Sequence, residues 1–153
     1  MTLLFVFLIG FFAGLRSLTP PAAVAWAVRL GWLELARPLS LIGSLPAVII
    51  LSVLAAAEFF IDKLPSTPNR TAPLGFIARI VTGGLAGACV GVGGGKTVLV
   101  GSLLGLCGGI VGCFGGFHAR AWIVKSLRVP DFYVAMIEDL IAIGGSLFIV
   151  SRF

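Results

Sequence analysis

Two segments of this chain are long and apolar enough to cross a membrane as helices. Residues 38–57 and 97–119 contain no Asp, Glu, Lys or Arg. A helix needs about 20 apolar residues to cross the roughly 30 Å hydrocarbon core of a bilayer, and both segments meet that length. The chain is 59% hydrophobic and 11% charged, whereas a soluble domain carries about 25% charged residues. The sequence therefore predicts an all-α integral membrane protein, with the lipid bilayer as its first partner.

Other apolar segments bring the expected number of membrane crossings to about four or five. Residues 1–153 are expected to form a single transmembrane domain. Full-length helices are predicted over residues 39–61, 74–92, 97–117 and 131–150. A proline-rich loop over residues 62–73 and a glycine-rich turn over residues 93–96 separate the first three of these helices.

The N-terminal segment, residues 1–37, is predicted to form a broken or re-entrant helix pair. Residues 3–14 are apolar but reach only about 18 Å as a helix, which is too short for a span. Thr19-Pro20-Pro21 favours the start of a second helix, because Thr is a good N-cap and proline fits the first turn. No Lys or Arg precedes the apolar stretch, so a cleaved signal peptide is not expected. The alternative is a plain short span with Arg16 at the membrane surface.

Glycines recur every fourth residue on two of the predicted helices. One stripe contains Gly83, Gly87, Gly91 and Gly95, the second contains Gly108, Gly112 and Gly116, and a further face contains Gly101, Gly105 and Gly109. Small residues at this spacing let membrane helices approach closely, so the pattern predicts glycine-zipper packing. Arg79 and Arg120 continue the two stripes at the same spacing, so both side chains are expected to face neighbouring helices.

Acidic residues on the other two helices are expected near the same membrane surface. Glu58 and Asp62 share one face of the helix over residues 39–61, and Glu138 shares a face with small residues of the last helix. A charged group inside a bilayer costs about 2–3 kcal/mol or more unless it pairs or faces water, so each one is a candidate functional residue. The predicted substrate- or ion-binding set is Arg16, Thr19, Glu58, Asp62, Arg79, Arg120, Glu138 and Asp139.

This set of charges has two interpretations. Carboxylates can satisfy the guanidinium groups and hold four helices in register. Alternatively, the charges form a polar vestibule or ion-coupling site in which Glu58 or Glu138 exchanges a proton. Arg16, beside the start of a helix, would then favour a small anionic or proton-coupled solute. The simpler role for Arg16 is that of an interfacial anchor.

No metal or cofactor site is predicted. Cys89, Cys107 and Cys113 lack C-x-x-C spacing and lie in apolar segments, and His118 has no second ligand at suitable spacing. The net charge of +5 comes from scattered basic residues, which membrane topology explains better than nucleic-acid binding does. No nucleic-acid partner is expected.

Several polar segments carry a resemblance to a known family. They are Ala13-Gly-Leu-Arg16, Thr19-Pro-Pro-Ala-Ala-Val-Ala-Trp26, Asp62-Lys-Leu-Pro65, Thr67-Pro-Asn-Arg-Thr71, Ala78-Arg79 and Glu138-Asp139. Through these segments nearly the whole chain resembles a family of small bacterial inner-membrane proteins known as domain-of-unknown-function family 4126. The resemblance implies a multi-pass protein of the bacterial cytoplasmic membrane and no established activity.

Three functions agree with these features. A transporter or channel for a small solute or ion comes first, because inward-facing charges and a broken first helix suit a solute path. The alternatives are a structural or assembly protein without transport, and an intramembrane lipid-modifying enzyme. A water-accessible cavity would favour the first, a dry bundle of paired charges the second, and a lateral groove beside the carboxylates the third. A second copy of the chain is a possible partner, because a chain this small often needs one to enclose a pore.

Lys and Arg residues predict the orientation in the membrane. The face expected to be cytoplasmic carries Lys63, Arg70, Arg79, Arg120, Lys125 and Arg128, and the other carries Arg29, Arg37, Lys96 and Arg152. The loops over residues 62–73 and 120–130 should therefore share the cytoplasmic face, with both termini outside.

Single cysteines can test this orientation in a background that lacks the three native cysteines. A membrane-impermeant thiol reagent added to intact cells should label Lys96→Cys and Arg152→Cys but neither Lys63→Cys nor Arg128→Cys. Labelling of both loop positions from outside would invert the orientation. Labelling of only one of them would show that the two loops lie on different faces.

Overall fold

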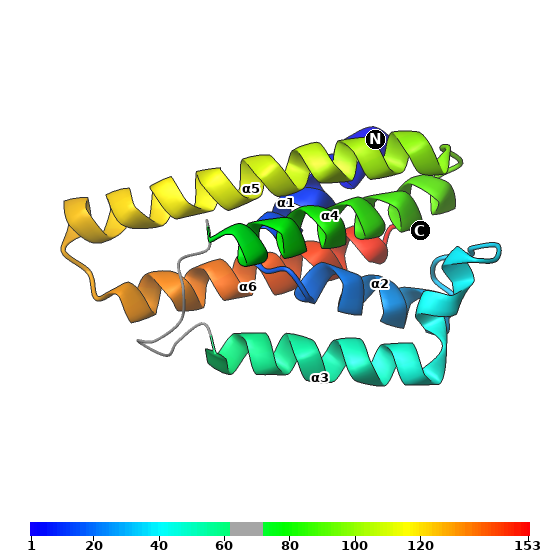
Figure 1. Cartoon of the computed structure of the whole chain (residues 1–153), viewed down its shortest axis with the longest axis horizontal. Coiled ribbons are helices and arrows are strands. Elements are labelled where there is room, and N and C mark those ends of the chain that lie inside the picture. Colours follow the sequence, from blue (N-terminus) through cyan, green and yellow to red (C-terminus); the bar gives the residue numbers. More distant parts are fainter. Residues whose placement is uncertain (62–71) are drawn as a thin grey trace.

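Helices account for all regular secondary structure in residues 1–61 and 72–153, the residues described by the computed structural model. They are α1 (Thr2–Leu15), α2 (Thr19–Arg29), the short 3-10 helix η1 (Leu39–Gly43), α3 (Leu45–Ile61), α4 (Pro73–Gly93), α5 (Val98–Leu127) and α6 (Asp131–Val150), arranged as in Figure 1. α4, α5 and α6 are long and apolar enough to cross a membrane, whereas α1 and α3 are shorter apolar helices. The all-α class is therefore confirmed, with three candidate membrane-spanning helices.

α1 and α2 form a hairpin whose open ends lie at the same end of the bundle (Figure 1). Thr2, at the start of α1, lies so close to Gly94 that a Cβ on this glycine would clash with it, and Leu33, after α2, lies equally close to Gly93. Both ends of the hairpin are thus beside the turn that joins α4 to α5. The hairpin tip, Arg16–Leu18, lies part-way along the bundle.

Glycines allow α4 and α5 to approach closely. A Cβ on Gly87 would lie 2.6 Å from the carbonyl oxygen of Gly101 and 2.7 Å from the Cα of Gly105. A Cβ on Gly91 would lie 2.9 Å from the Cα of Gly101, and one on Gly83 would lie 3.0 Å from the carbonyl oxygen of Gly105. No side chain fits at these points, so the two backbones are in direct contact.

Two further glycines of α5, Gly108 and Gly112, face α1. A Cβ on Gly108 would clash with the carbonyl oxygen of Phe7, and a Cβ on Gly112 would clash with that of Phe11. Gly116 is also buried on α5. α1 packs against both α4 and α5. These contacts fix how far along the bundle the hairpin tip lies.

Apolar side chains fill the space between the hairpin, α4 and α6. Val6 and Ile9 of α1, Val24 of α2, Val90 of α4 and Ile149 of α6 are almost completely buried in this core. Large apolar side chains are also exposed on the outer faces of the helices. Such extended apolar surfaces are typical of a protein surrounded by lipid.

The structure divides the predicted helix over residues 39–61 into two pieces. η1 ends at Gly43, Ser44 is extended with ψ 148°, and α3 begins only at Leu45. Pro46 lies in the first turn of α3, where its missing N–H costs nothing, whereas deeper in a helix it would remove a hydrogen bond. α3 therefore has 17 residues and is shorter than a typical span.

α5 extends beyond the predicted segment, residues 97–117, and ends at Leu127. The prediction stopped where the apolar run ends, yet no Gly or Pro interrupts the chain between Arg120 and Leu127, so the helix continues past the charged residues. Arg128, the residue directly after α5, has a φ of 49° and ends the helix in a left-handed conformation. Arg120 consequently lies on a helix and not in a loop over residues 120–130.

Replacing Gly87 by Leu should destabilise the protein, because the new side chain would force α4 and α5 apart. We expect a loss of about 1–3 kcal/mol or more in the free energy of unfolding, the usual cost of overpacking. Thermal melting of the detergent-solubilised protein measures it. Gly144→Leu on α6 is the control, since no atom lies within 4 Å of a Cβ at this position. Equal melting temperatures for the two variants would show that contact through Gly87 does not hold α4 against α5.

Candidate functional site

Two acidic side chains from different helices hold the hairpin tip. Asp139 of α6 pairs with Arg16, with Oδ1 3.0 Å from Nη1. Glu58 of α3 binds the next two residues: its Oε1 accepts hydrogen bonds from the N–H of Ser17 at 2.8 Å and from the hydroxyl of Ser17 at 2.6 Å, and its Oε2 accepts one from the N–H of Leu18 at 3.0 Å. Polar contacts at the tip therefore connect the hairpin to both α3 and α6.

Glu58 caps the N-terminus of α2 from a neighbouring helix. The first N–H groups of a helix have no partner within it, and Leu18, at the N-cap position of α2, has no side-chain acceptor. A carboxylate supplies the missing acceptor and is also favoured by the positive end of the helix dipole. With both carboxylate oxygens engaged, Glu58 connects the hairpin tip to α3.

Arg16 is buried but only partly satisfied. The residue is 1% exposed, and its Nη1 pairs with Asp139. Its Nε and Nη2 are buried and have no hydrogen-bond partner among the described residues. These two N–H groups lie on one edge of the guanidinium, which can bind a carboxylate or phosphate through two parallel hydrogen bonds. Because buried polar groups are nearly always paired, a carboxylate or phosphate is a chemically suitable partner for this edge.

The ring of Phe59 packs against the guanidinium of Arg16. The Cζ of Arg16 lies 5.1 Å from the centroid of the Phe59 ring, within the range of a cation–π contact. The contact is made with the π face of the ring and uses no guanidinium N–H as a hydrogen-bond donor. Phe59 therefore helps to position Arg16 without using its free donors.

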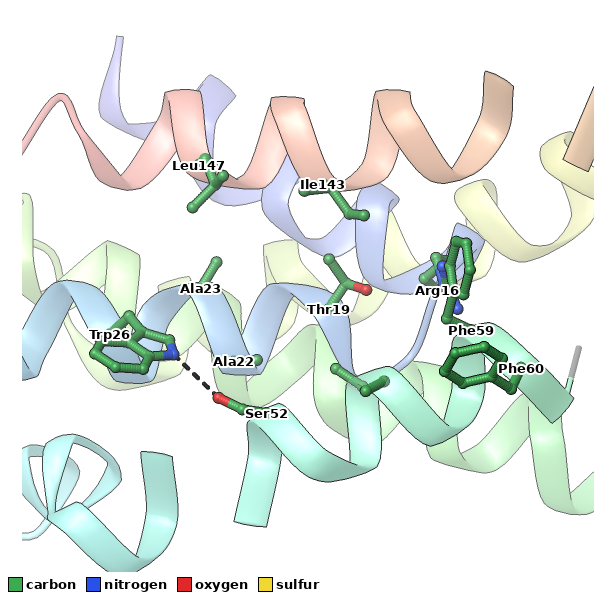
Figure 2. Close-up of a pocket in the computed structure, with 12 residues that line it drawn as sticks. Arg16, Thr19, Ala22, Ala23, Trp26, Ser52, Phe59, Phe60, Ile143 and Leu147 are labelled. Carbon is green, nitrogen blue, oxygen red and sulfur yellow. Dashed lines mark hydrogen bonds between the residues drawn. The ribbon is translucent and has the colours of Figure 1, made fainter. Parts of the chain in front are cut away.

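A pocket of about 340 Å³ extends from Arg16 along α2, between α3 and α6 (Figure 2). Its lining residues are Arg16, Thr19, Ala22, Ala23, Trp26, Ser52, Ala55, Ala56, Phe59, Phe60, Ile143 and Leu147. At the end away from Arg16, the indole N–H of Trp26 donates a hydrogen bond of 3.0 Å to the hydroxyl oxygen of Ser52. Apart from these polar groups and Thr19, the lining is apolar.

A second charged group joins α5 to α6. Arg120 donates hydrogen bonds to both carboxylate oxygens of Asp131, at 2.7 Å from Nε and 2.5 Å from Nη2. Its Nη1 lies 3.7 Å from Oε2 of Glu138. The side chain of Asp131 is 62% exposed, so water screens this pair. Glu138 and Asp139 thus contact different arginines although they are neighbours in the chain.

The remaining predicted residues are Arg79, Thr19 and Asp62. Arg79 is buried on α4 with its backbone beside Gly109, and within the described part of the chain its Nε has no partner. Thr19 lines the pocket next to Arg16. Asp62 lies outside the described residues. The structure therefore brings Arg16, Glu58 and Asp139 to the hairpin tip, and places Arg120 with Glu138 in a separate group.

The sequence prediction omitted the uncharged residues beside Arg16 and at the far end of the pocket. Ser17, Phe59, Trp26 and Ser52 cost little in a membrane, so an argument from the cost of buried charge does not select them. Asp131 was also left out of the predicted set. Asp131 lies seven residues before Glu138 and therefore on the same face of the helix. This spacing was the one sequence feature that could have placed Asp131 in the set.

The chain matches one known protein family over nearly its whole length. The family described as Domain of unknown function (DUF4126) matches residues 3–151. The chain belongs to this family. The match confirms the resemblance carried by the polar segments, and it includes the hairpin tip, the pocket and both charged groups. No curated protein and no solved structure matches the chain. Membership in DUF4126 assigns no activity, so the function must be argued from the site.

Replacing Asp139 by Asn should strongly destabilise the fold, because Arg16 would lose the carboxylate that neutralises it. Removing one partner of a buried ion pair typically costs about 3–5 kcal/mol. Asp131→Asn is the control at an exposed pair and should cost about 1 kcal/mol or less. Unfolding of both variants in detergent would measure the difference. Similar costs at the two positions would mean that the contact with Asp139 does not stabilise the hairpin tip.

Proposed function

We propose that this protein is a small membrane transporter that binds the anionic group of its solute at Arg16. One observation carries the proposal: a buried guanidinium with a free Nε–Nη2 edge lies at the end of a pocket. A charge inside a membrane is costly, and such residues commonly mark a substrate path. A donor edge without an acceptor among the described residues is suited to a partner that binds and leaves.

The broken helix pair supports the same proposal. In many transporters, discontinuous helices meet at a substrate site part-way through the membrane. α1 and α2 meet in this way at the hairpin tip. Because Glu58 already occupies two N–H groups at the start of α2, Arg16 supplies the positive charge for the solute in place of the helix N-terminus.

The proposed site also suggests how a proton could accompany the solute. A bound anion would bring a second negative charge to Arg16, close to the carboxylate of Asp139. Movement of a proton together with the anion would keep the site neutral. Asp139 is better placed to carry this proton than Glu58, whose two oxygens hold the hairpin tip.

The proposed setting is the cytoplasmic membrane of a bacterium. α4, α5 and α6 cross the bilayer, α3 crosses as a fourth helix near the lower length limit of about 17 residues, and the hairpin re-enters from one side. The glycine contacts of α1, α4 and α5 then act as a glycine zipper. The end that carries the connection from α5 to α6 faces the cytoplasm.

A structural or assembly role is the second candidate. The pairs Arg16–Asp139 and Arg120–Asp131, together with the direct backbone contacts at glycines, would stabilise a helical bundle whether or not it carries a solute. This role leaves the free edge of Arg16 without a purpose. We therefore favour transport.

Uptake into proteoliposomes tests the proposal, with inorganic phosphate, butyl phosphate and octyl phosphate as probes. The parent protein should show saturable uptake of at least one of them. The double variant Arg16→Gln/Asp139→Asn removes both charges of the pair, so neither is left buried alone, and uptake should fall at least tenfold. Lys96→Gln/Lys125→Gln removes two exposed charges and should change little.

Two results would contradict the proposal. Uptake by Arg16→Gln/Asp139→Asn equal to that of the parent would show that the site does not bind the solute. Uptake by the parent no greater than that of protein-free vesicles would favour the structural role.

A further inference from the structure

We infer that the solute is a single-chain anionic amphiphile, whose oxyanion binds Arg16 and whose alkyl chain lies in the pocket between α2, α3 and α6. This inference rests on the proposed function, because it names the class of solute that the same site takes. A carboxylate and a phosphate head group share the chemistry required.

The two ends of the pocket differ in polarity. Arg16 and Phe59 lie at one end, and Trp26 and Ser52 lie at the other (Figure 2). At the first end, two N–H donors on one edge of Arg16 are buried and have no acceptor among the described residues. At the other end the indole N–H is already bonded to Ser52. An anionic group therefore has its partner at the Arg16 end, and this sets the orientation of the bound molecule.

Small residues create the space between the two ends. The lining there includes Ala22 and Ala23 of α2 and Ala55 and Ala56 of α3. From Thr19 to Trp26 the pocket follows about two helical turns, or roughly 10 Å. Its volume, about 340 Å³, is near the lower end of the range of about 300–1,000 Å³ for small-ligand sites. A short alkyl chain fits such a space, whereas the two chains of a phospholipid do not.

Exposed apolar side chains border the pocket between α3 and α6. Phe60 is 70% exposed, Leu147 is 47% exposed and Ile143 is 38% exposed. α3 packs mainly on α2 and η1, which leaves α3 and α6 apart at this side. In a membrane protein an apolar opening of this kind faces lipid. A molecule that is already concentrated in the bilayer can therefore enter the pocket beside Arg16 without passing through water.

The head group should dominate selectivity. The free energy of an alkyl chain changes little when it moves from lipid into an apolar pocket, because both surroundings are apolar. The two hydrogen bonds to the guanidinium edge have no equivalent in the hydrocarbon region. A neutral amphiphile would leave the edge of Arg16 unpaired, and a small hydrophilic anion would leave the apolar part of the pocket without a ligand.

Trp26 provides a direct test because its side chain lines the pocket. Trp32→Phe/Trp122→Phe leaves Trp26 as the one tryptophan in the chain, and Trp26→Phe/Trp32→Phe leaves only the 68% exposed Trp122 of α5. Both proteins are placed in phosphatidylcholine nanodiscs and titrated with 8-bromooctyl phosphate, whose bromine quenches nearby indoles. Quenching of Trp26 should saturate, whereas that of Trp122 should rise without saturation.

Two variants in the Trp26 background test separately the binding of the alkyl chain and the binding of the anionic head group. Ala56→Leu fills the apolar part of the pocket without touching a charge and should weaken saturable quenching at least tenfold. Val53→Leu, on the exposed face of α3, is its control and should change nothing. Arg16→Gln/Asp139→Asn should abolish saturation. Because Ala56→Leu leaves every polar contact in place, the test holds even if the charge variant folds poorly.

The outcomes distinguish this inference from the proposed function. Saturable quenching that Ala56→Leu does not affect would overturn the amphiphile inference, and so would equal, non-saturating quenching of Trp26 and Trp122. If proteoliposomes still took up inorganic phosphate in an Arg16-dependent way, the transporter proposal would stand alone. Repeating the titration with 8-bromooctanoate shows whether the site prefers a carboxylate or a phosphate head group.

Discussion

The arrangement of this protein depends on neutralising one buried guanidinium. Arg16 lies between two apolar helices and is 1% exposed, and an isolated buried charge is costly, so the fold must bring a carboxylate to it. Asp139 does this from α6, and Glu58 binds the adjacent backbone from α3. Two distant segments are thereby tied to one hairpin tip. The remaining donors of Arg16 are not used by the described protein, and this incomplete pairing is what makes the tip a candidate binding site.

The position of that tip follows from close backbone packing. Apolar side chains give little net attraction between helices in lipid, so contact between small residues becomes the main source of association. α1 lies against α4 and α5 where glycines of these helices carry no side chain in the way. α3 has no comparable glycine contacts and packs mainly on α2 and η1. The pocket thus lies between the tightly packed part of the bundle and its most loosely attached helix.

Much of the fold was predictable because the physical costs are local. Apolar runs and their lengths identified the helices, and the four-residue glycine spacing predicted a buried position for Arg79. Two boundaries were missed for equally local reasons. Pro46 and extended Ser44 split the helix predicted over residues 39–61, and α5 continues past Arg120 because a helix does not end where its apolar residues end.

The sequence by itself determined that the chain is a helical membrane-type protein and that its charged residues need partners or water. It could not determine which partners they find, because pairing depends on the rotation and depth of helices that are distant in the chain. Only the tertiary structure shows that Arg16 pairs with Asp139 and Arg120 with Asp131. It also shows that Glu58 accepts hydrogen bonds at the start of α2. It also created the pocket, since Ala23 and Ala56 leave a space only when α2 and α3 face each other beside α6.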